Sequence, residues 1–598
     1  MTFFDRTTKL RWRRRIRRSR QQVEEFGTQA EDNLEKQFFN RLSRLTRVRR
    51  FVAAWVLLFI LLIGGVLYQT RILGRYYLKP TPADGGIYSE GILGTFTNAN
   101  PIYVASSVDN SVERLVFSGL LKYDQDNKLV GDLAEGFTVD ARGTNYTVTL
   151  KKNLVWHDGK PLTADDVVFT YKLIQTPDAK SPLFNSWNGI SVTKVDARTI
   201  SFVLPSILSA FPHSLTNGII PKHILEGTPT AQLRSLAFNT TKPVGSGPFK
   251  WEAVEVTGAN PDAREQRIGL IPNENYVGGK PAVDKMIIRT FQDEKRLASA
   301  FKKREVNAVA GLSTVPKDFS EDLSIREYNI PLSSEVMVFF KNSSAVFSDI
   351  KVRQAMSYAT NPSEVIDAIN RPVLPATGPL IRGQVGFDPT IKQNTSNPEQ
   401  AQKMLDEAGW TMGPKGYRVK GTLPLSFALT TQSNSVYDNA AQTLKKQWQA
   451  VGAKVDIVSL RDEELQAALT SQGHNYDALL YGISLGADPD VFAYWHSSQI
   501  DGRAGGRLNL SEYQSTVADR GLEGGRTRPE DAVRASKYKS FLAAWRDDAP
   551  AVALYQPRYL YLAREPLYGF SPTLMNSGAD RFNNVVNWKI RQSKQPEQ

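Results

Sequence analysis

The chain has 598 residues, and its 41% hydrophobic and 23% charged content is that of a folded protein too long for one ordinary core. It has no cysteine, which excludes disulfides, thiolate metal sites, a catalytic cysteine and a lipid-bearing cysteine. The formal net charge is +13, but residues 1–50 hold 15 Lys and Arg against 6 Asp and Glu, so the rest carries only +4 and the basic character belongs to the tail and not to the main body.

The first fifty residues form a basic tail. Residues 11–18 (RWRRRIRR) are a run of a kind that binds nucleic acid or anionic lipid. We favour a cytoplasmic retention signal that contacts lipid headgroups, and we expect no nucleic-acid partner. Apolar residues between Val23 and Val48 recur every three or four positions, which predicts an amphipathic helix. This helix fits either a coiled coil or the inner membrane surface, and the sequence does not choose between them.

An uncharged segment follows the tail. Residues 51–68 (FVAAWVLLFILLIGGVLY) are apolar over a length of about 27 Å as a helix, enough to cross a bilayer. More arginines precede the segment than follow it, which places the N-terminus in the cytoplasm and residues 75–598 outside. The long basic region and the lack of a small-x-small site favour a retained signal anchor over a cleaved signal peptide. The sequence thus predicts a tail at 1–50, a transmembrane helix at 51–70 and a linker at 71–83.

Residues 113–172 carry several local signals in succession. Apolar residues alternate with threonines at 146–150, which predicts a half-buried strand. Asp158-Gly159 predicts a tight turn, since glycine adopts positive φ at low steric cost. Thr163 then predicts the N-cap of a helix, with two aspartates in its first turn.

These signals occur in an order that resembles a known family. The blocks are LVFSGLLKYD at 115–124, GDLAEGF at 131–137 and YTVTLKKNLVWHDGKPLTADDVVFTY at 146–171. They resemble the signature of solute-binding protein family 5, the extracytoplasmic oligopeptide-, dipeptide- and nickel-binding receptors of ABC transporters. Later blocks, FSDIKVRQAMSYATN and YDALLYGISLGADPDVFAYWHSS, extend the resemblance, which covers about residues 84–590.

The resemblance implies an α/β fold with a two-lobed, periplasmic-binding-protein-like ectodomain of type II and an enlarged first lobe. Lobe one is expected from 84–332 and 553–590, lobe two from 333–552, and a polar tail from 591–598. The second lobe also shows the strand and helix alternation of an α/β unit.

Local patterns in the second lobe give further predictions. Residues 335–340 (EVMVFF) predict an apolar strand, Ser348 the cap of the next helix, and Gly409 the end of another. The glycine- and arginine-rich segments 502–506 and 521–528 predict exposed loops.

The resemblance also implies a ligand site between the lobes. By position, the ligand-binding residues are Ala105, Ser106, Ser107, Tyr481, Gly482, Ile483, Ser484 and Asp488. Peptide-binding members have an aspartate shortly before the Asp-Pro to pair with the ligand's amino group, but residues 482–487 contain no acid. Either Asp488 or Asp490 takes this role, or the ligand has no free amine there.

Catalytic and metal motifs are weak. The five histidines lie in no metal-ligand spacing, and Asp488-Pro489-Asp490 lacks the glycine and bidentate acid of a calcium loop. His157-Asp158 looks like half of a catalytic pair, but a turn needs Asp-Gly at this place. We therefore expect no enzyme, no metal and no cofactor.

The sequence thus predicts an extracytoplasmic substrate-binding protein of an ABC transporter. It would be held at the cell membrane by one helix and would deliver a peptide or peptide-like solute to ABC permease subunits. Two alternatives remain open: a membrane-anchored sensor or scaffold whose cytoplasmic helix engages a partner, and a cell-wall peptide hydrolase.

Overall fold

The computed structural model describes residues 49–258, 264–470, 474–500 and 508–596. The basic tail, the predicted amphipathic helix and the predicted loop at 502–506 lie outside these ranges. The chain divides into two compact units, Met1–Thr81 with Gln592–Gln598, and Pro82–Arg591.

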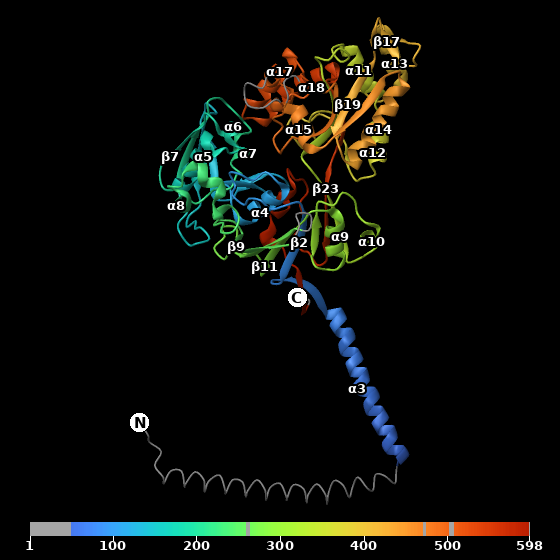
Figure 1. The fold of residues 1–598 in the computed structure, drawn as a ribbon. Helices are drawn as coiled ribbons and strands as arrows, with labels where there is room; N and C mark the ends of the chain where they lie inside the picture. The colour runs from blue at the N-terminus through green and yellow to red at the C-terminus, as the bar shows by residue number, and fades with distance from the viewer. Residues whose placement is uncertain (1–48, 259–263, 471–473, 501–507, 597–598) are drawn as a thin grey trace, which may run out of the picture. The chain divides into compact units, whose positions relative to one another are not determined.

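The described part of the smaller unit begins with the long helix α3 (Arg49–Tyr77) (Figure 1). Within it, Phe51–Arg71 is long and apolar enough to cross a membrane, judged by length and composition. The strand β1 (Leu78–Ala83) follows and pairs with β24 (Arg591–Pro596). The segment expected to be a linker, 71–83, is therefore largely regular structure, because α3 extends to Tyr77 and β1 follows it. The segment expected to be a polar tail, 591–598, is largely the strand β24, because the backbones of β1 and β24 satisfy each other's hydrogen bonds.

Lobe one of the larger unit is built on a seven-stranded sheet with the order β13-β23-β12-β2-β11-β10-β9. In this sheet β2 runs parallel to β11 and β12, and the other pairs are antiparallel. The strands are β2 (Ile87–Leu93), β9 (Phe249–Thr257), β10 (Glu265–Pro272), β11 (Lys285–Phe291), β12 (Ala308–Ala310), β13 (Ile325–Pro331) and β23 (Arg558–Arg564).

Smaller strands and helices complete lobe one. A four-stranded sheet has the order β5-β6-β8-β7, and β3 pairs with β4. These strands are β3 (Leu121–Tyr123), β4 (Leu129–Gly131), β5 (Ala134–Val139), β6 (Asn145–Leu150), β7 (Ser191–Lys194) and β8 (Thr199–Val203). The helices are α4 (Ser107–Val116), α5 (Ala164–Ile174), α6 (Phe184–Trp187), α7 (Phe211–Ser214), α8 (Lys222–Leu225), α9 (Glu294–Lys302) and α10 (Lys317–Ser320).

Lobe two is built on a six-stranded mixed sheet with the order β15-β22-β14-β21-β19-β20. Its strands are β14 (Ser334–Phe340), β15 (Leu374–Pro375), β19 (Ser426–Gln432), β20 (Lys454–Leu460), β21 (Ala478–Ser484) and β22 (Ala551–Gln556), and β16 (Thr411–Met412), β17 (Arg418–Lys420) and β18 (Leu423–Pro424) form a separate small sheet. The helices are α11 (Ile350–Ala359), α12 (Pro362–Ile369), α13 (Pro398–Glu407), α14 (Ser435–Ala450), α15 (Asp462–Thr470), α16 (Phe492–Trp495), α17 (Thr516–Arg526) and α18 (Asp531–Asp548).

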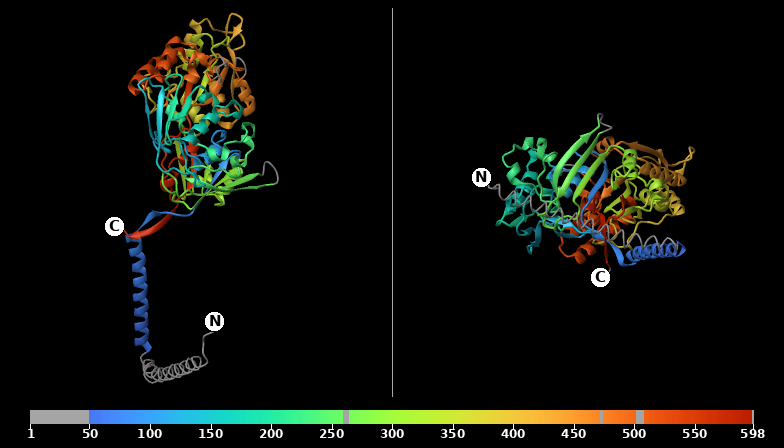
Figure 2. Two further views of the ribbon diagram at one scale, coloured as in Figure 1. Left: turned by 90° about the vertical axis from the view of Figure 1, so that its left-hand side faces the viewer. Right: turned by 90° about the horizontal axis from the view of Figure 1, so that it is seen from below.

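The two sheets define the two lobes of the expected α/β architecture. Figures 1 and 2 show the yellow and orange elements of lobe two gathered apart from the blue and green elements of lobe one, with β23 in red returning to lobe one. The six-stranded sheet is covered on both faces: Val336, Val338 and Phe340 of β14 enter one hydrophobic core, and Met337 and Phe339 enter another. Burial of both faces explains why this strand is a continuous apolar run.

The predicted lobe boundary at residue 553 differs from the strand pairing. β22 pairs with β14, so residues 551–556 belong to the second sheet. The chain changes sheets at Pro557, which has no N–H to donate and ends the strand.

The local predictions have mixed outcomes. Gly159 has a φ of +84°, and Thr163 caps α5 in a reciprocal capping box with Asp166, which confirms the turn and the helix start. The cap predicted at Ser348 is wrong by one residue, since the side chain of Asp349 accepts from Lys351 N at 3.0 Å. Gly409 follows α13 with a φ of +82°, as predicted.

The glycine-rich segment 521–528 is not an exposed loop. Helix α17 continues to Arg526 and packs on α18. A Cβ at Gly521 would lie 2.9 Å from Phe541 Cβ, and one at Gly525 would lie 2.4 Å from the Tyr538 ring. These glycines therefore allow close helix packing, which the composition did not reveal.

A buried ionic network ties the C-terminal segment to lobe one. The carboxylate of Glu90 in β2 accepts from Arg581 Nε at 3.1 Å and from Tyr561 Oη at 2.7 Å. The Glu90 and Arg581 side chains are 0% and 1% exposed. Removing one partner leaves an uncompensated charge in a dry interior, so the network holds β2, β23 and the segment around Arg581 together.

We expect Arg581→Met to lower the free energy of unfolding by about 3–5 kcal/mol, because Glu90 loses its cation. Thermal unfolding of the purified full-length protein measures this. Arg267→Met is the matched control: its pair with Glu255 has side chains 52% and 63% exposed, and its loss is expected to cost less than about 1 kcal/mol. Equal, small effects of the two substitutions would contradict the assignment.

Candidate ligand-binding cleft

A cleft of about 800 Å³ lies between the two lobes. Lobe one lines it with Glu294, Ser313, Thr314, Val315, Glu327, Asn329, Arg558 and Leu560, and lobe two with residues 334–336, 369–373, 434–437, 482–484 and Tyr555. A concave space of this size, lined from two lobes, is typical of a site that encloses a small molecule or short peptide.

The paired ends of β14 and β21 form the floor of the cleft. In the antiparallel pair β14 and β21, Ser334 lies opposite Ser484 and Val336 lies opposite Gly482. A Cβ at Gly482 would lie 2.8 Å from Tyr437 Oη, so the glycine lets this tyrosine pack against the strand. Burial raises the pKa of Tyr437 to about 12, so its hydroxyl stays protonated and can donate a hydrogen bond.

Two helix ends supply another wall of the cleft. Asn434 caps α14 by accepting from Val436 N at 3.1 Å and Tyr437 N at 3.0 Å. Asn370 ends α12 in the left-handed conformation with a φ of +49°, and the chain then turns into the cleft-lining residues Arg371 to Val373.

The cleft contains two arginines that form no ion pair among the described residues. Neither Arg371 nor Arg558 makes an ion pair with any residue in the part of the chain that the structure describes, and Arg558 Nε is buried without a hydrogen bond. Burial lowers the pKa of Arg371, an effect that the negative charge of Glu294 opposes. Arginine side chains are positively charged in proteins, so this part of the cleft suits an anionic group such as a carboxylate.

Two acids of the cleft are already engaged. Glu294 accepts from Ser313 N at 3.1 Å and from Ser313 Oγ at 2.7 Å. Glu327 accepts from Asn329 Nδ2. These bonds fix the two carboxylates in the wall of lobe one.

The structure brings only some of the predicted site residues to this cleft. Gly482, Ile483 and Ser484 line it, whereas Tyr481 precedes them on β21 and does not. Ala105, Ser106 and Ser107 lie at the start of α4 and are also not among its lining residues. Ser106 instead caps α4 by accepting from Asp109 N at 3.0 Å. A role of these other residues in ligand binding stays a prediction.

Asp488 is paired within lobe two. Arg534 Nη2 donates to both of its carboxylate oxygens, at 2.7 and 2.9 Å. From lobe one, His213 Nε2 lies 3.8 Å from the same carboxylate, and His213 Nδ1 lies 2.9 Å from Tyr123 Oη. Burial is the main reason that the pKa of His213 is lowered. The carboxylate of Asp488 therefore joins lobe–lobe packing and has a cation already.

Asp490 is engaged as well. Its carboxylate pairs with Arg526 Nη2 at 3.1 Å, and the Arg526 guanidinium stacks over the Phe492 ring at 4.0 Å. Phe492 and Arg526 border a second hollow of about 360 Å³, whose other wall is residues 186–208 of lobe one. Neither aspartate expected to take a ligand amine is thus without a partner.

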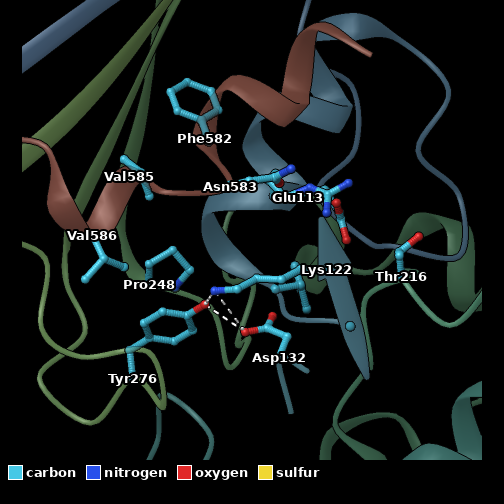
Figure 3. Close-up of a pocket in the computed structure, with 13 residues that line it drawn as sticks. Glu113, Lys122, Asp132, Thr216, Pro248, Tyr276, Phe582, Asn583, Val585 and Val586 are labelled. Atoms are coloured by element: carbon cyan, nitrogen blue, oxygen red, sulfur yellow. Dashed lines mark hydrogen bonds and ion pairs between the residues drawn. The ribbon is translucent and has the colours of Figure 1, made fainter. Parts of the chain in front are cut away.

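A much smaller cavity lies inside lobe one. Figure 3 shows the Lys122 amine beside both the Tyr276 hydroxyl and the Asp132 carboxylate, with Glu113 across the pocket. Tyr276 Oη donates to Asp132 at 2.9 Å, and Lys122 Nζ lies 3.5 Å from the same carboxylate. The cavity measures about 20 Å³, enough for about one water molecule, so it belongs to the core.

His157 has a structural role. Its Nδ1 accepts from Gly245 N at 3.2 Å, so the proton is on Nε2, which donates to Gly247 O at 3.1 Å. Burial lowers its pKa to about 4, which keeps the ring neutral. Asp158 pairs with His223 at 2.7 Å and not with His157. The predicted turn is confirmed, and His157 and Asp158 each have a different hydrogen-bond partner. Across the described ranges, no group of three or more His, Asp or Glu residues could hold a metal ion.

The comparison with protein families gives one match over most of the chain. Residues 128–503 match the model described as bacterial extracellular solute-binding proteins, family 5 Middle. Among curated proteins, the oligopeptide-binding protein AppA of Bacillus subtilis is 28% identical over 499 residues, which are 82% of this chain and 89% of AppA. A putative ABC transporter peptide-binding protein of Brucella melitensis is 25% identical over 525 residues, 86% of this chain and 96% of the relative.

Solved structures share the architecture. The structure of Bacillus subtilis AppA in complex with a nonapeptide superposes with a TM-score of 0.69 at 26% identity, covering 85% of this chain and 100% of that one. This similarity extends over both lobes, so the two-lobed assignment rests on the strand order and on an independent comparison.

The buried Glu113 gives a pH-dependent prediction. Burial raises its pKa to about 7, an effect that Arg114 opposes. A raised pKa means that the folded state binds more protons than the unfolded state between the ordinary pKa of 4.5 and 7, so stability falls as pH rises through this window.

We compare the free energy of unfolding of Glu113→Gln with that of the unsubstituted protein at each pH. The difference, variant minus unsubstituted protein, is expected to rise by about 2–3 kcal/mol from pH 4.5 to pH 8. Urea unfolding at several pH values measures the difference. Glu135→Gln, at a side chain that is 51% exposed, is the control and is expected to show no such trend. A difference that does not change with pH would disprove the explanation.

Proposed function

The chain belongs to the bacterial extracellular solute-binding proteins of family 5, and we propose that it captures a peptide or peptide-like solute between its lobes for delivery to an ABC permease. The resemblance inferred from the sequence blocks is confirmed by the family match and by the relatives. Its function as a substrate-binding protein of an ABC transporter follows from the same relatives.

The interlobe cleft is the observation that best supports a peptide as the ligand. Its volume of about 800 Å³ lies within the range of ligand sites, and its floor is the end of two paired strands. An extended peptide fits a site of this size beside strand ends, because its main chain offers hydrogen-bond donors and acceptors while its side chains occupy the remaining space. Arg371 and Arg558 would hold a carboxylate in the same cleft.

Lobe closure would supply the affinity. When the lobes close on a bound solute, water leaves the cleft and each polar contact strengthens in the lower dielectric. The family consists of binding proteins, and the cleft acids Glu294 and Glu327 are engaged by hydrogen bonds in its wall. We infer that the cycle is binding and release without a chemical step, with no cofactor.

The proposed function includes a position at the cell membrane. We propose that Phe51–Arg71 of α3 is a single membrane anchor, with the basic tail in the cytoplasm and the lobes outside. Its hydropathy and the excess of arginines before it support this topology. A retained helix would keep the receptor close to its permease partner.

We expect a peptide library to raise the melting temperature of the purified full-length protein, because a ligand that binds only the folded state stabilises it by about 2.7 kcal/mol at a hundredfold excess over Kd. Ser484→Trp is expected to abolish the shift, since Ser484 is exposed and lines the cleft. Ser191→Trp, at an exposed position of β7, is the matched control and keeps it. No shift with any peptide in the unsubstituted protein would refute the proposed ligand class.

The absence of cysteine makes the topology easy to test. We expect a membrane-impermeant maleimide to label Lys152→Cys, at an exposed site of lobe one, in intact spheroplasts. Thr28→Cys, in the basic tail, is expected to react only after the membrane is permeabilised. The reverse labelling pattern, or release of the protein by alkaline carbonate, would contradict a cytoplasmic tail with a retained anchor.

A further inference from the structure

Glu335 is an acid at an unusual place. It is the second residue of β14, lines the cleft and lies opposite Ile483 in the strand pairing. The residue is 1% exposed, and the five residues that follow it in the strand are all apolar and buried. A strand buried on both faces is stabilised by apolar side chains, so packing alone does not call for an acid here.

The carboxyl group of Glu335 has no partner among the residues that the structure describes. Its Oε2 is buried, and no hydrogen bond or ion pair reaches the carboxyl group from any described residue. Burial alone raises the pKa of Glu335 well above its ordinary value, with no nearby cation to oppose it. A buried carboxyl group without a partner is costly, so a structural role would be expected to come with a donor.

The other acids near the cleft differ from Glu335 in this respect. Glu294 and Glu327 accept hydrogen bonds from neighbours in lobe one. Asp488 and Asp490 are paired with Arg534 and Arg526. Within the described ranges, Glu335 is the one cleft-lining acid whose carboxyl group is unused.

We propose that Glu335 is a specificity-determining residue that receives a protonated amine of the bound solute. This inference rests on the proposed function and narrows it: the solute carries a free amino group that lies near the β14–β21 floor. When the ammonium group arrives, the neutral carboxylic acid releases its proton to solvent, and the resulting carboxylate accepts a charge-assisted hydrogen bond.

Arg371 and Arg558 complement this assignment. They provide the opposite charge in the same cleft and also lack an ionic partner among the described residues. A solute with a free amine and a free carboxylate would satisfy both groups, whereas a neutral solute would leave three buried or half-buried ionisable side chains without partners. The substrate class that fits is a zwitterionic peptide.

The test compares two pentapeptide libraries of random sequence, one with free N-termini and one N-acetylated. Calorimetric titration of the full-length protein is done in two buffers of different ionisation enthalpy, which also yields the number of protons released. We expect the free-amine library to bind at least about tenfold more tightly and to release up to one proton per bound peptide. Glu335→Gln is expected to lose the preference and the proton release, while Glu255→Gln, an exposed acid of β9, keeps both.

The outcomes separate the two proposals. If both libraries bind equally to the unsubstituted protein, or if Glu335→Gln keeps the preference for the free amine, the role of Glu335 is refuted while peptide binding stands. If neither library binds, the proposed function fails and the assignment of Glu335 fails with it. The melting temperature of Glu335→Gln without ligand verifies that this variant is folded.

Discussion

The cleft depends on how the chain crosses between the two sheets. It passes from β13 to β14 and returns from β22 to β23, and the two crossings are hydrogen-bonded side by side: Leu332 N donates to Pro557 O at 3.0 Å, and Gln556 Nε2 donates to Leu332 O at 2.9 Å. Two short, adjacent crossings are the geometry of a hinge, because a few residues can absorb a rotation while both sheets stay intact. The cleft-lining residues 334–336, Tyr555, Pro557 and Arg558 lie at these crossings, so lobe closure would act on the ligand directly.

Short-range chemistry explains what the sequence could predict. The turn at Gly159, the cap at Thr163 and the strand at 335–340 follow from side chains within a few residues of one another, and the structure contains all three. The ordered blocks also identified the family and therefore the two-lobed fold. The cap at Ser348 was wrong by one residue because serine and aspartate are equally good caps and stand side by side.

Long-range contacts explain what the sequence could not predict. The glycines of α17 signal a loop by composition, and only the proximity of α18 makes them a packing surface. Whether Asp488 is available to a ligand depends on Arg534, which lies 46 residues away. Arg371 and Arg558 lie in no sequence motif that would have identified them as cleft residues. Glu335 had a weak signal, an acid near the start of an apolar strand, but its lack of a partner among the described residues could be seen only in three dimensions.

A crystal structure of the protein with a bound peptide from the free-amine library tests the central claim most directly. We expect electron density for an extended peptide between the lobes, along the β14–β21 floor beside Ser484, with its amine at Glu335 and its carboxylate at Arg371 or Arg558. Peptide density elsewhere, for example in the hollow bordered by Phe492 and Arg526, with the cleft of about 800 Å³ empty, would contradict it.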